Sequence, residues 1–185
     1  TIVTTAGSNA HAEGNFTTAS APFSHVEGQY SEASGLSSHA EGHFTKATGL
    51  AAHSEGSQSL ASGDQSHAEG RLTTASGGQS HAEGFSTKAV GSWSHAEGSF
   101  TTATALYAHV EGSNTEALAG ANYSHAEGSA TNTKGDFSHA EGRNTVTNGL
   151  YSHAEGESTT TAEVADSSHA EGLGTITSAS HQHAQ

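Results

Sequence analysis

The chain has 185 residues, a formal net charge of −14 with neutral histidines, and only five lysine and arginine residues. Because it has so few cationic residues, the chain cannot form an extended phosphate-binding surface. We therefore expect neither nucleic acid nor an anionic membrane surface as a partner. The sequence contains no cysteine, which excludes disulfides, thiolate metal sites and cysteine catalysis. Its apolar runs also fall short of the roughly 18 residues of a transmembrane helix.

A five-residue signature, Ser-His-Ala-Glu-Gly in most copies, recurs along the whole chain. Its histidines are 14 residues apart from His11 to His109, and the next intervals up to His169 are 16, 14, 14 and 16 residues. A truncated thirteenth copy begins at His183. Repeats of short, fixed period are typical of solenoids. We predict a single repeat domain over residues 1–185, with about twelve complete coils, and we expect it to be a segment of a longer fibre.

Each copy consists of two similar halves, and small residues occupy every second position for five residues in each half. In one copy these stretches are residues 66–70 and 73–77. A period of two predicts β-strands, and the two-residue spacers predict corners. Serine, alanine and glycine are predicted to fill the inside of a narrow roll, while histidine and glutamate face outward. The fold class is therefore all-β, with parallel coils that advance about 4.8 Å each and give a rod roughly 60 Å long.

The two 16-residue copies each contain two extra residues, which follow Thr115 and Thr159. Insertions into solenoid repeats usually enlarge a corner and leave the stack intact. We expect both insertions to form bulges of this kind.

Large apolar side chains are predicted at the corners, where they would form stripes along the edges of the roll. Because the predicted interior buries few carbon atoms, a single chain is expected to be only marginally stable. Exposed apolar stripes usually mark contact surfaces, so we expect these edges to pack against neighbouring subunits. The edge residues are Phe16, Phe23, Tyr30, Phe44, Leu72, Trp93, Phe100, Tyr107, Tyr123, Phe137 and Tyr151.

The doubled Ser-x-Ala-x-Gly-x-x pattern resembles the YadA-like head repeats of trimeric autotransporter adhesins. It is also similar to Ser-His-Ala-Glu-Gly repeats in tail-fibre proteins of phages and prophages of Gram-positive bacteria. The resemblance covers about residues 8 to 185. It implies a left-handed parallel β-roll that assembles as a homotrimer around a threefold axis.

The resemblance also implies a role for the outward histidines and glutamates. Trimeric adhesin heads often carry aliphatic residues at these positions, where they face the trimer centre, so the ionisable residues depart from the family pattern. The implied axial residues are His11, Glu13, His25, Glu27, His39, Glu41, His53, Glu55, His67, Glu69, His81, Glu83, His95, Glu97, His109, Glu111, His125, Glu127, His139, Glu141, His153, Glu155, His169 and Glu171.

A carboxylate ladder at strand spacing repels itself unless each group meets a donor. We therefore predict that histidine and glutamate contact each other across subunits. The alternative is a metal ion or an anion on the threefold axis, with His67, Glu69, His81 and Glu83 as candidate metal ligands. Pairing is favoured because the residues recur in every coil, and no cofactor is expected. His43 and His181 lie outside the signature and are predicted to be solvated.

The repeated pattern favours a structural protein over an enzyme. Within a signature, neighbours such as Ser38 and His39 point to opposite faces of a strand, which excludes a Ser-His-acid triad there. Outward threonines such as Thr102 and Thr104 fit an ice-binding face, but charged residues interrupt the array. Calcium-binding repeats fit poorly because the chain has few aspartates.

The favoured function is that of a structural or adhesive fibre segment, either a trimeric surface adhesin head or a rigid spacer. A phage or prophage tail-fibre shaft or receptor-binding segment is the alternative. Both place the chain outside the cell, on a bacterial surface or a virion tail. Both also leave room for a ligand on the host surface or in the matrix.

Overall fold

The structure is a computed structural model that describes residues 3–5 and 7–185. The described residues divide into two compact units, with the boundary between Trp93 and Ser94. Short β-strands are the only regular elements in this part of the chain, so it contains no helix able to cross a membrane.

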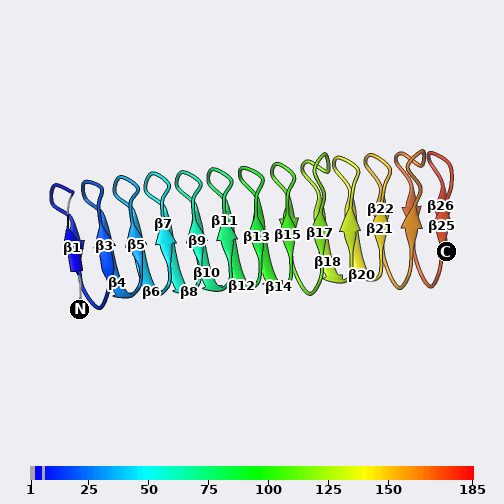
Figure 1. Cartoon of the computed structure of the whole chain (residues 1–185). Coiled ribbons are helices and arrows are strands. Elements are labelled where there is room, and N and C mark those ends of the chain that lie inside the picture. Colours follow the sequence, from blue (N-terminus) through cyan, green and yellow to red (C-terminus); the bar gives the residue numbers. More distant parts are fainter. Residues whose placement is uncertain (1–2, 6) are drawn as a thin grey trace. The chain divides into compact units, whose positions relative to one another are not determined.

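The first unit contains two parallel sheets, here called the histidine sheet and the second sheet, whose strands alternate along the chain (Figure 1). Its histidine sheet contains β2 (His11–Ala12), β4 (His25–Gln29), β6 (His39–His43), β8 (His53–Ser57), β10 (His67–Arg71) and β12 (His81–Phe85). Its second sheet contains β1 (Val3–Thr5), β3 (Thr17–Ala19), β5 (Glu32–Ala33), β7 (Lys46–Ala47), β9 (Leu60–Ala61), β11 (Thr74–Ala75) and β13 (Lys88–Ala89).

The second unit repeats this arrangement. Its histidine sheet contains β14 (His95–Ser99), β16 (His109–Val110), β18 (His125–Ser129), β20 (His139–Arg143), β22 (His153–Ala154), β24 (His169–Ala170) and β26 (His183–Ala184). Its second sheet contains β15 (Thr102–Ala103), β17 (Glu116–Ala117), β19 (Asn132–Thr133), β21 (Val146–Thr147), β23 (Thr160–Thr161) and β25 (Ile176–Thr177).

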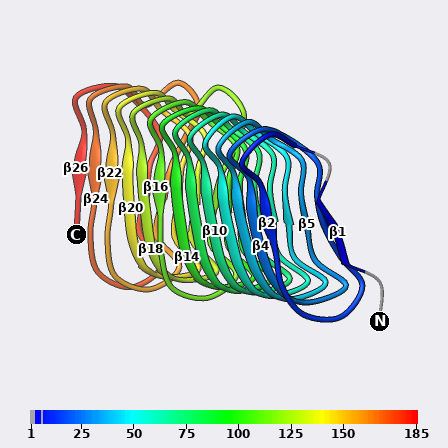
Figure 2. The same ribbon diagram turned by 90° about the vertical axis from the view of Figure 1, so that its left-hand side faces the viewer.

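Equivalent residues of successive coils pair in register, as His67 with His81 and Thr74 with Lys88. In Figure 2, β2 and β4 lie on one side of the coil, and β1 and β5 lie on the other. The predicted fold class is confirmed as an all-β parallel solenoid of about twelve turns. The strands differ in length from the prediction. Histidine-sheet strands begin at the histidine, and second-sheet strands after the first are mostly only two residues long.

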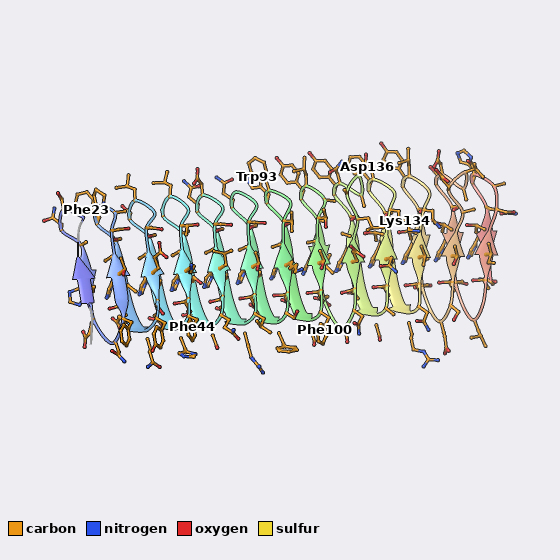
Figure 3. The ribbon with its side chains drawn as sticks, viewed as in Figure 1. Phe23, Phe44, Trp93, Phe100, Lys134 and Asp136 are labelled. Carbon is orange, nitrogen blue, oxygen red and sulfur yellow. The ribbon has the colours of Figure 1, made fainter. Side chains whose placement is uncertain are left out.

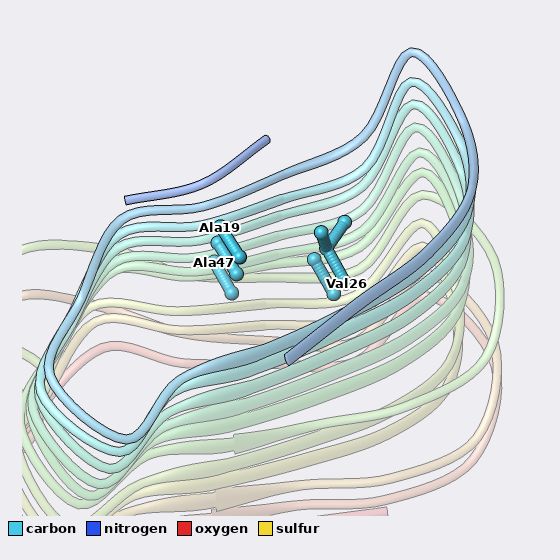
Figure 4. Close-up of a cluster of buried hydrophobic side chains, with 5 residues drawn as sticks. Ala19, Val26 and Ala47 are labelled. Atoms are coloured by element: carbon cyan, nitrogen blue, oxygen red, sulfur yellow. The ribbon is translucent and has the colours of Figure 1, made fainter. Parts of the chain in front are cut away.

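Among the residues whose burial the structure describes, those in the interior have only small side chains, as predicted for a narrow roll. In the first unit, Ala19 and Ala47 of the second sheet face Val26 of the histidine sheet, and all three are fully buried (Figure 4). Several buried serines are satisfied locally, as Ser66 Oγ donates to the carbonyl oxygen of Gly63 at 2.7 Å. Small side chains let the two sheets approach closely, so the core is thin and poor in carbon.

The signature glycines do not fill the interior, and this part of the prediction was wrong. Gly70 is exposed and has φ +106°, a conformation that disfavours any side chain. A Cβ placed on Gly70 would lie 2.2 Å from the carbonyl oxygen of Gly84 in the next coil. Strand pairing continues through Gly70 to Arg71, but the positive φ ends the regular period-two alternation after the glutamate. The glycines of the second half, such as Gly63, are buried as predicted.

The corners rely on left-handed backbone conformations at residues that rarely adopt them. Leu72 has φ 61°, Phe44 has φ 57° and Tyr123 has φ 57°. The inter-coil hydrogen bonds explain this geometry, because the Leu72 N–H donates to the carbonyl oxygen of Ser57 at 3.0 Å. The Phe44 N–H donates likewise to Gln29, at 2.9 Å. At these corners, the hydrogen bond to the preceding coil therefore offsets the local backbone strain.

The two insertions enlarge corners and leave the register intact, as predicted. His109 still pairs with His125, and His153 still pairs with His169. The extra residues form tight turns, in one of which the Ala121 N–H donates to the carbonyl oxygen of Leu118 at 3.0 Å. The solenoid therefore absorbs two residues at a corner without any change in strand pairing.

All three aspartates of the chain lie at corners, where they accept backbone hydrogen bonds from the preceding coil. Asp64 Oδ1 accepts the Leu50 N–H at 3.0 Å, and Asp166 Oδ1 accepts the Leu150 N–H at 2.8 Å. Asp136 Oδ1 accepts the Asn122 N–H at 2.7 Å. These aspartates accept hydrogen bonds from corner N–H groups that lie outside the regular strand pairing.

The histidine and glutamate face

The outward side of the histidine sheet, here called the His–Glu face, carries the signature histidines and glutamates. Strand register places equivalent histidines directly over one another, and their rings stack face to face. The His39 and His53 centroids are 4.7 Å apart with planes 5° from parallel, and those of His125 and His139 are 4.8 Å apart and 2° from parallel. The first pair differs, since the His11 and His25 rings meet at 83°. The predicted ladder and its spacing are confirmed within each unit.

Histidine and glutamate of the same signature lie side by side, because residues two apart on a strand share a face. The Nε2–Oε2 distance is 3.6 Å between His67 and Glu69, and 3.6 Å between His139 and Glu141. Near the end of the chain the pairing shifts by one coil. His169 Nε2 lies 3.5 Å from Glu155 Oε1 and 4.0 Å from Glu171 Oε2. Every one of these contacts forms within one chain, and contacts across subunits stay a prediction.

The face is only half-buried: the His67 and Glu69 side chains are 34% and 35% exposed. Even so, the Nε2 atoms of many signature histidines are shielded from solvent and make no hydrogen bond. The nearby carboxylate is close enough for attraction but is not aligned as an acceptor. These Nε2 atoms belong to His25, His39, His53, His67, His109, His125, His139, His153 and His169.

Burial lowers the pKa of His39, His67, His125, His139 and His153. The positive charge of neighbouring imidazoles in the stack lowers these pKa values further, and nearby carboxylates oppose the shift in all five. Desolvation disfavours the charged form of any group, so the neutral ring is favoured in the stack.

The pKa values of Glu55 and Glu141 are raised, chiefly by burial. Hydrogen bonding is the second cause, with Glu69 for Glu55 and with Glu155 for Glu141. The pKa of Glu155 is lowered, chiefly by hydrogen bonds with Glu141 and Glu171. The raised pKa of Glu141 beside the lowered pKa of Glu155 favours a proton on Glu141 before one on Glu155, which would reduce the repulsion between these two carboxyl groups as the pH falls.

We expect acidification from about pH 7.5 to about pH 5.5 to destabilise the fold. Because the folded histidines have lowered pKa values, the unfolded chain binds more protons as the pH falls through the ordinary histidine value near 6.5. The stabilisation present above that value is therefore lost. Glu55 and Glu141 act with the opposite sign, because their raised pKa values favour proton uptake by the folded chain at lower pH.

Urea midpoints measured across this pH range at fixed protein concentration test the prediction. The variant His139→Asn is expected to weaken the pH dependence. His181→Asn is the matched control, because His181 is exposed and outside the ladder. A midpoint that rises from about pH 7.5 to about pH 5.5 would contradict the prediction.

The predicted edge residues all lie at corners and are exposed, with a relative exposure of the residue between 39% for Leu72 and 62% for Tyr151. In the first unit, Phe23 and Trp93 lie at one edge and Phe44 at the opposite edge (Figure 3). Many of these rings stack on each other. In the first unit Tyr30 stacks between Phe16 and Phe44, with centroids 4.9 and 4.8 Å apart.

In the second unit a longer aromatic stack follows one edge. Centroid distances are 4.7 Å between Tyr107 and Tyr123, 4.9 Å between Tyr123 and Phe137, and 5.0 Å between Phe137 and Tyr151. Stacking covers the ring faces and leaves the ring edges exposed along the corner. The solenoid therefore presents aromatic edges to whatever lies outside it.

The remaining predicted residues lie where the alternation placed them. Ser38 is buried and donates to the carbonyl oxygen of Gly35 at 2.7 Å, while His39 points to the opposite side of the strand. His43 and His181 are exposed. His43 also contacts Phe44 edge-on, with centroids 4.4 Å apart, a contact that the sequence argument missed.

No protein-family model matches the chain, and neither does any curated protein. The functional argument therefore depends on the chain's own geometry and on the resemblance of its repeat.

Proposed function

We propose that the chain is a non-enzymatic segment of a homotrimeric surface fibre. In this proposal each chain is a left-handed β-roll, and three rolls meet through their His–Glu faces around a common axis. The fibre acts as an adhesive head or as a rigid spacer on a bacterial surface. The resemblance of the repeat to trimeric adhesin heads supports both the handedness and the threefold assembly.

One observation carries the proposal: the chain keeps its large apolar side chains outside. The interior of the described part contains alanine, serine, threonine and two valines, Val26 and Val110, but no aromatic side chain. Burial of apolar surface is the main favourable term in folding, and a core of this composition supplies little of it. Association that covers the exposed corners and the half-buried His–Glu face supplies the missing burial.

The proposal assigns different roles to the two kinds of surface. The His–Glu face meets its counterparts in the sister chains, where histidine from one chain reaches glutamate of another. The aromatic corners pack against the sister chains, while the second sheet faces outward and is available to a host-surface or matrix ligand. A phage or prophage tail fibre uses the same architecture, so that origin stays the alternative reading of the repeat.

Light scattering coupled to gel filtration tests the assembly. We expect a mass three times the 18.6 kDa of one chain at micromolar concentration. Glu69→Lys, on the His–Glu face of β10, is expected to weaken the trimer by at least about tenfold, because it removes the carboxylate that a sister chain's histidine would contact and buries an unpaired ammonium. Thr74→Lys, outward on β11 of the same coil, is the matched control and leaves the trimer intact. A stable folded monomer, or equal effects of the two variants, would refute the proposal.

A further inference from the structure

Three side chains on the His–Glu face of the second unit have the composition of a transition-metal site. His125 and Glu127 of β18 lie beside His139 of β20, and one ligand atom from each lies within 4.8 Å of the others. His125 Nε2 is 3.6 Å from Glu127 Oε2, and the two imidazole rings stack 4.8 Å apart. Imidazole nitrogen and carboxylate oxygen are the ligands that Zn²⁺ takes in proteins without cysteine.

A second observation points to a ligand at the same place. The Nε2 atoms of His125 and His139 are shielded from solvent and have no hydrogen-bond partner. Buried polar atoms are nearly always satisfied, so unsatisfied nitrogens on both of these histidines call for an explanation. A metal ion held between Nε2 and the adjacent carboxylate would satisfy both groups at once.

We propose that His125, Glu127 and His139 bind a divalent transition-metal ion, with Zn²⁺ as the representative of the class. With Zn–N and Zn–O bonds near 2.0 Å, two ligands of a tetrahedral ion lie about 3.3 Å apart. The 3.6 Å between His125 Nε2 and Glu127 Oε2 is close to this separation. His139 completes the set when the two stacked rings tilt towards each other by roughly 1.5 Å in total, and water takes the fourth position.

The same triad recurs along the face, which sets the capacity of the chain. Equivalent sets are His67, Glu69 and His81 in the first unit, and His109, Glu111 and His125 in the second. A histidine Nε2 atom ligates one ion, so neighbouring triads compete for the histidine that they share. At most every second coil is occupied, which separates successive ions by about 10 Å and moderates their repulsion. All ligands of a site come from one chain, so the inference does not depend on the trimer.

The adjacency of histidines provides a sharp test with Zn²⁺ alone as the probe. Bound zinc is measured by elemental analysis after gel filtration at micromolar free Zn²⁺ and neutral pH. The wild-type chain is expected to retain about six ions, because two coils share one site. The alternating variant carries asparagine in place of every second signature histidine, at His25, His53, His81, His109, His139 and His169. It leaves no two signature histidines in adjacent coils, so it is expected to lose nearly all zinc.

A block variant with the same number of substitutions is the matched control. It leaves an uninterrupted ladder from His95 onward and is expected to retain about three ions. Its asparagine substitutions are at His11, His25, His39, His53, His67 and His81. Equal zinc retention by the two variants, or no zinc retained by the wild type, would overturn the inference.

A measurement on the unmodified ladder guards against variants that fail to fold. In imidazole nitrogen spectra of the wild-type chain, Zn²⁺ is expected to shift Nε2 of His125 and His139 and to leave His181 unmoved. Glu127→Gln is expected to weaken zinc binding at this pair at least about tenfold, since a neutral amide is a poorer ligand. Zinc that shifts His181 as strongly as His125 and His139 would mean scattered surface binding and would refute the site.

Discussion

Gly70→Ala is expected to destabilise the solenoid by about 3 kcal/mol or more, one of the largest effects available to a single methyl group. Two causes act together. The φ of +106° is unfavourable for any residue with a Cβ, and the added Cβ would lie 2.2 Å from the carbonyl oxygen of Gly84. That contact is to backbone, so no side-chain rotation relieves it. One coil has to move away from the next, which breaks inter-coil hydrogen bonds on both sides.

Gly78→Ala is the matched control for this substitution. Gly78 lies at a corner of the same unit, and its nearest neighbours to an added Cβ are 3.8 Å away or more. We expect a change within about 1 kcal/mol, because alanine restricts the unfolded chain without a clash. Urea unfolding at one protein concentration compares the two variants, since an oligomer's stability depends on concentration. Equal midpoints for the two variants would show that close packing of coils does not limit stability.

Ala68→Phe is expected to cost at least about 3 kcal/mol, because the space between the two sheets is filled by small side chains. Ala68 is fully buried in β10 and pairs in register with Ser54 and Ala82. A phenyl ring at this position has to separate the sheets or leave the roll. Either movement disrupts the ladders of several coils, so we expect cooperative loss of the neighbouring coils as well.

The chain itself supplies the graded control for this prediction. Val26 and Val110 occupy the position equivalent to Ala68 in their own coils and are fully buried. Ala68→Val is therefore expected to cost less than about 1.5 kcal/mol. Amide hydrogen exchange of β8, β10 and β12 measures how far each effect spreads. Similar exchange rates in the valine and phenylalanine variants would contradict the prediction, because they would show that the space between the two sheets can hold a phenyl ring.

The period of the sequence predicted most of the fold, because each coil obeys the same physical rule. Ser66, His67 and Ala68 alternate between the two sides of a strand as expected, with serine and alanine buried. The prediction failed one step later, at Gly70. The φ of Gly70 is positive, and only the backbone geometry reveals that the regular alternation of sides ends there although strand pairing continues.

The His–Glu face was predictable as a set of residues but not as a set of contacts. Residues two apart on a strand share a side, so the proximity of His67 and Glu69 follows from the strand itself. The direction of pairing does not, since His169 lies nearer to Glu155 of the preceding coil than to Glu171. The left-handed backbone conformation of the corner residues could not be predicted from the sequence either. Leucine, phenylalanine and tyrosine do not favour that conformation, and inter-coil hydrogen bonds impose it.

The two enlarged corners have a consequence for how such a repeat changes in length. Strand register from His109 to His125 is the same as elsewhere although the coil between them is longer. Insertions at that corner therefore do not change the strand pairing of the coils on either side. We expect foreign peptides grafted beyond Leu118 to be displayed laterally while neighbouring turns keep their geometry. The bend is accordingly the natural place to engineer recognition of a chosen target.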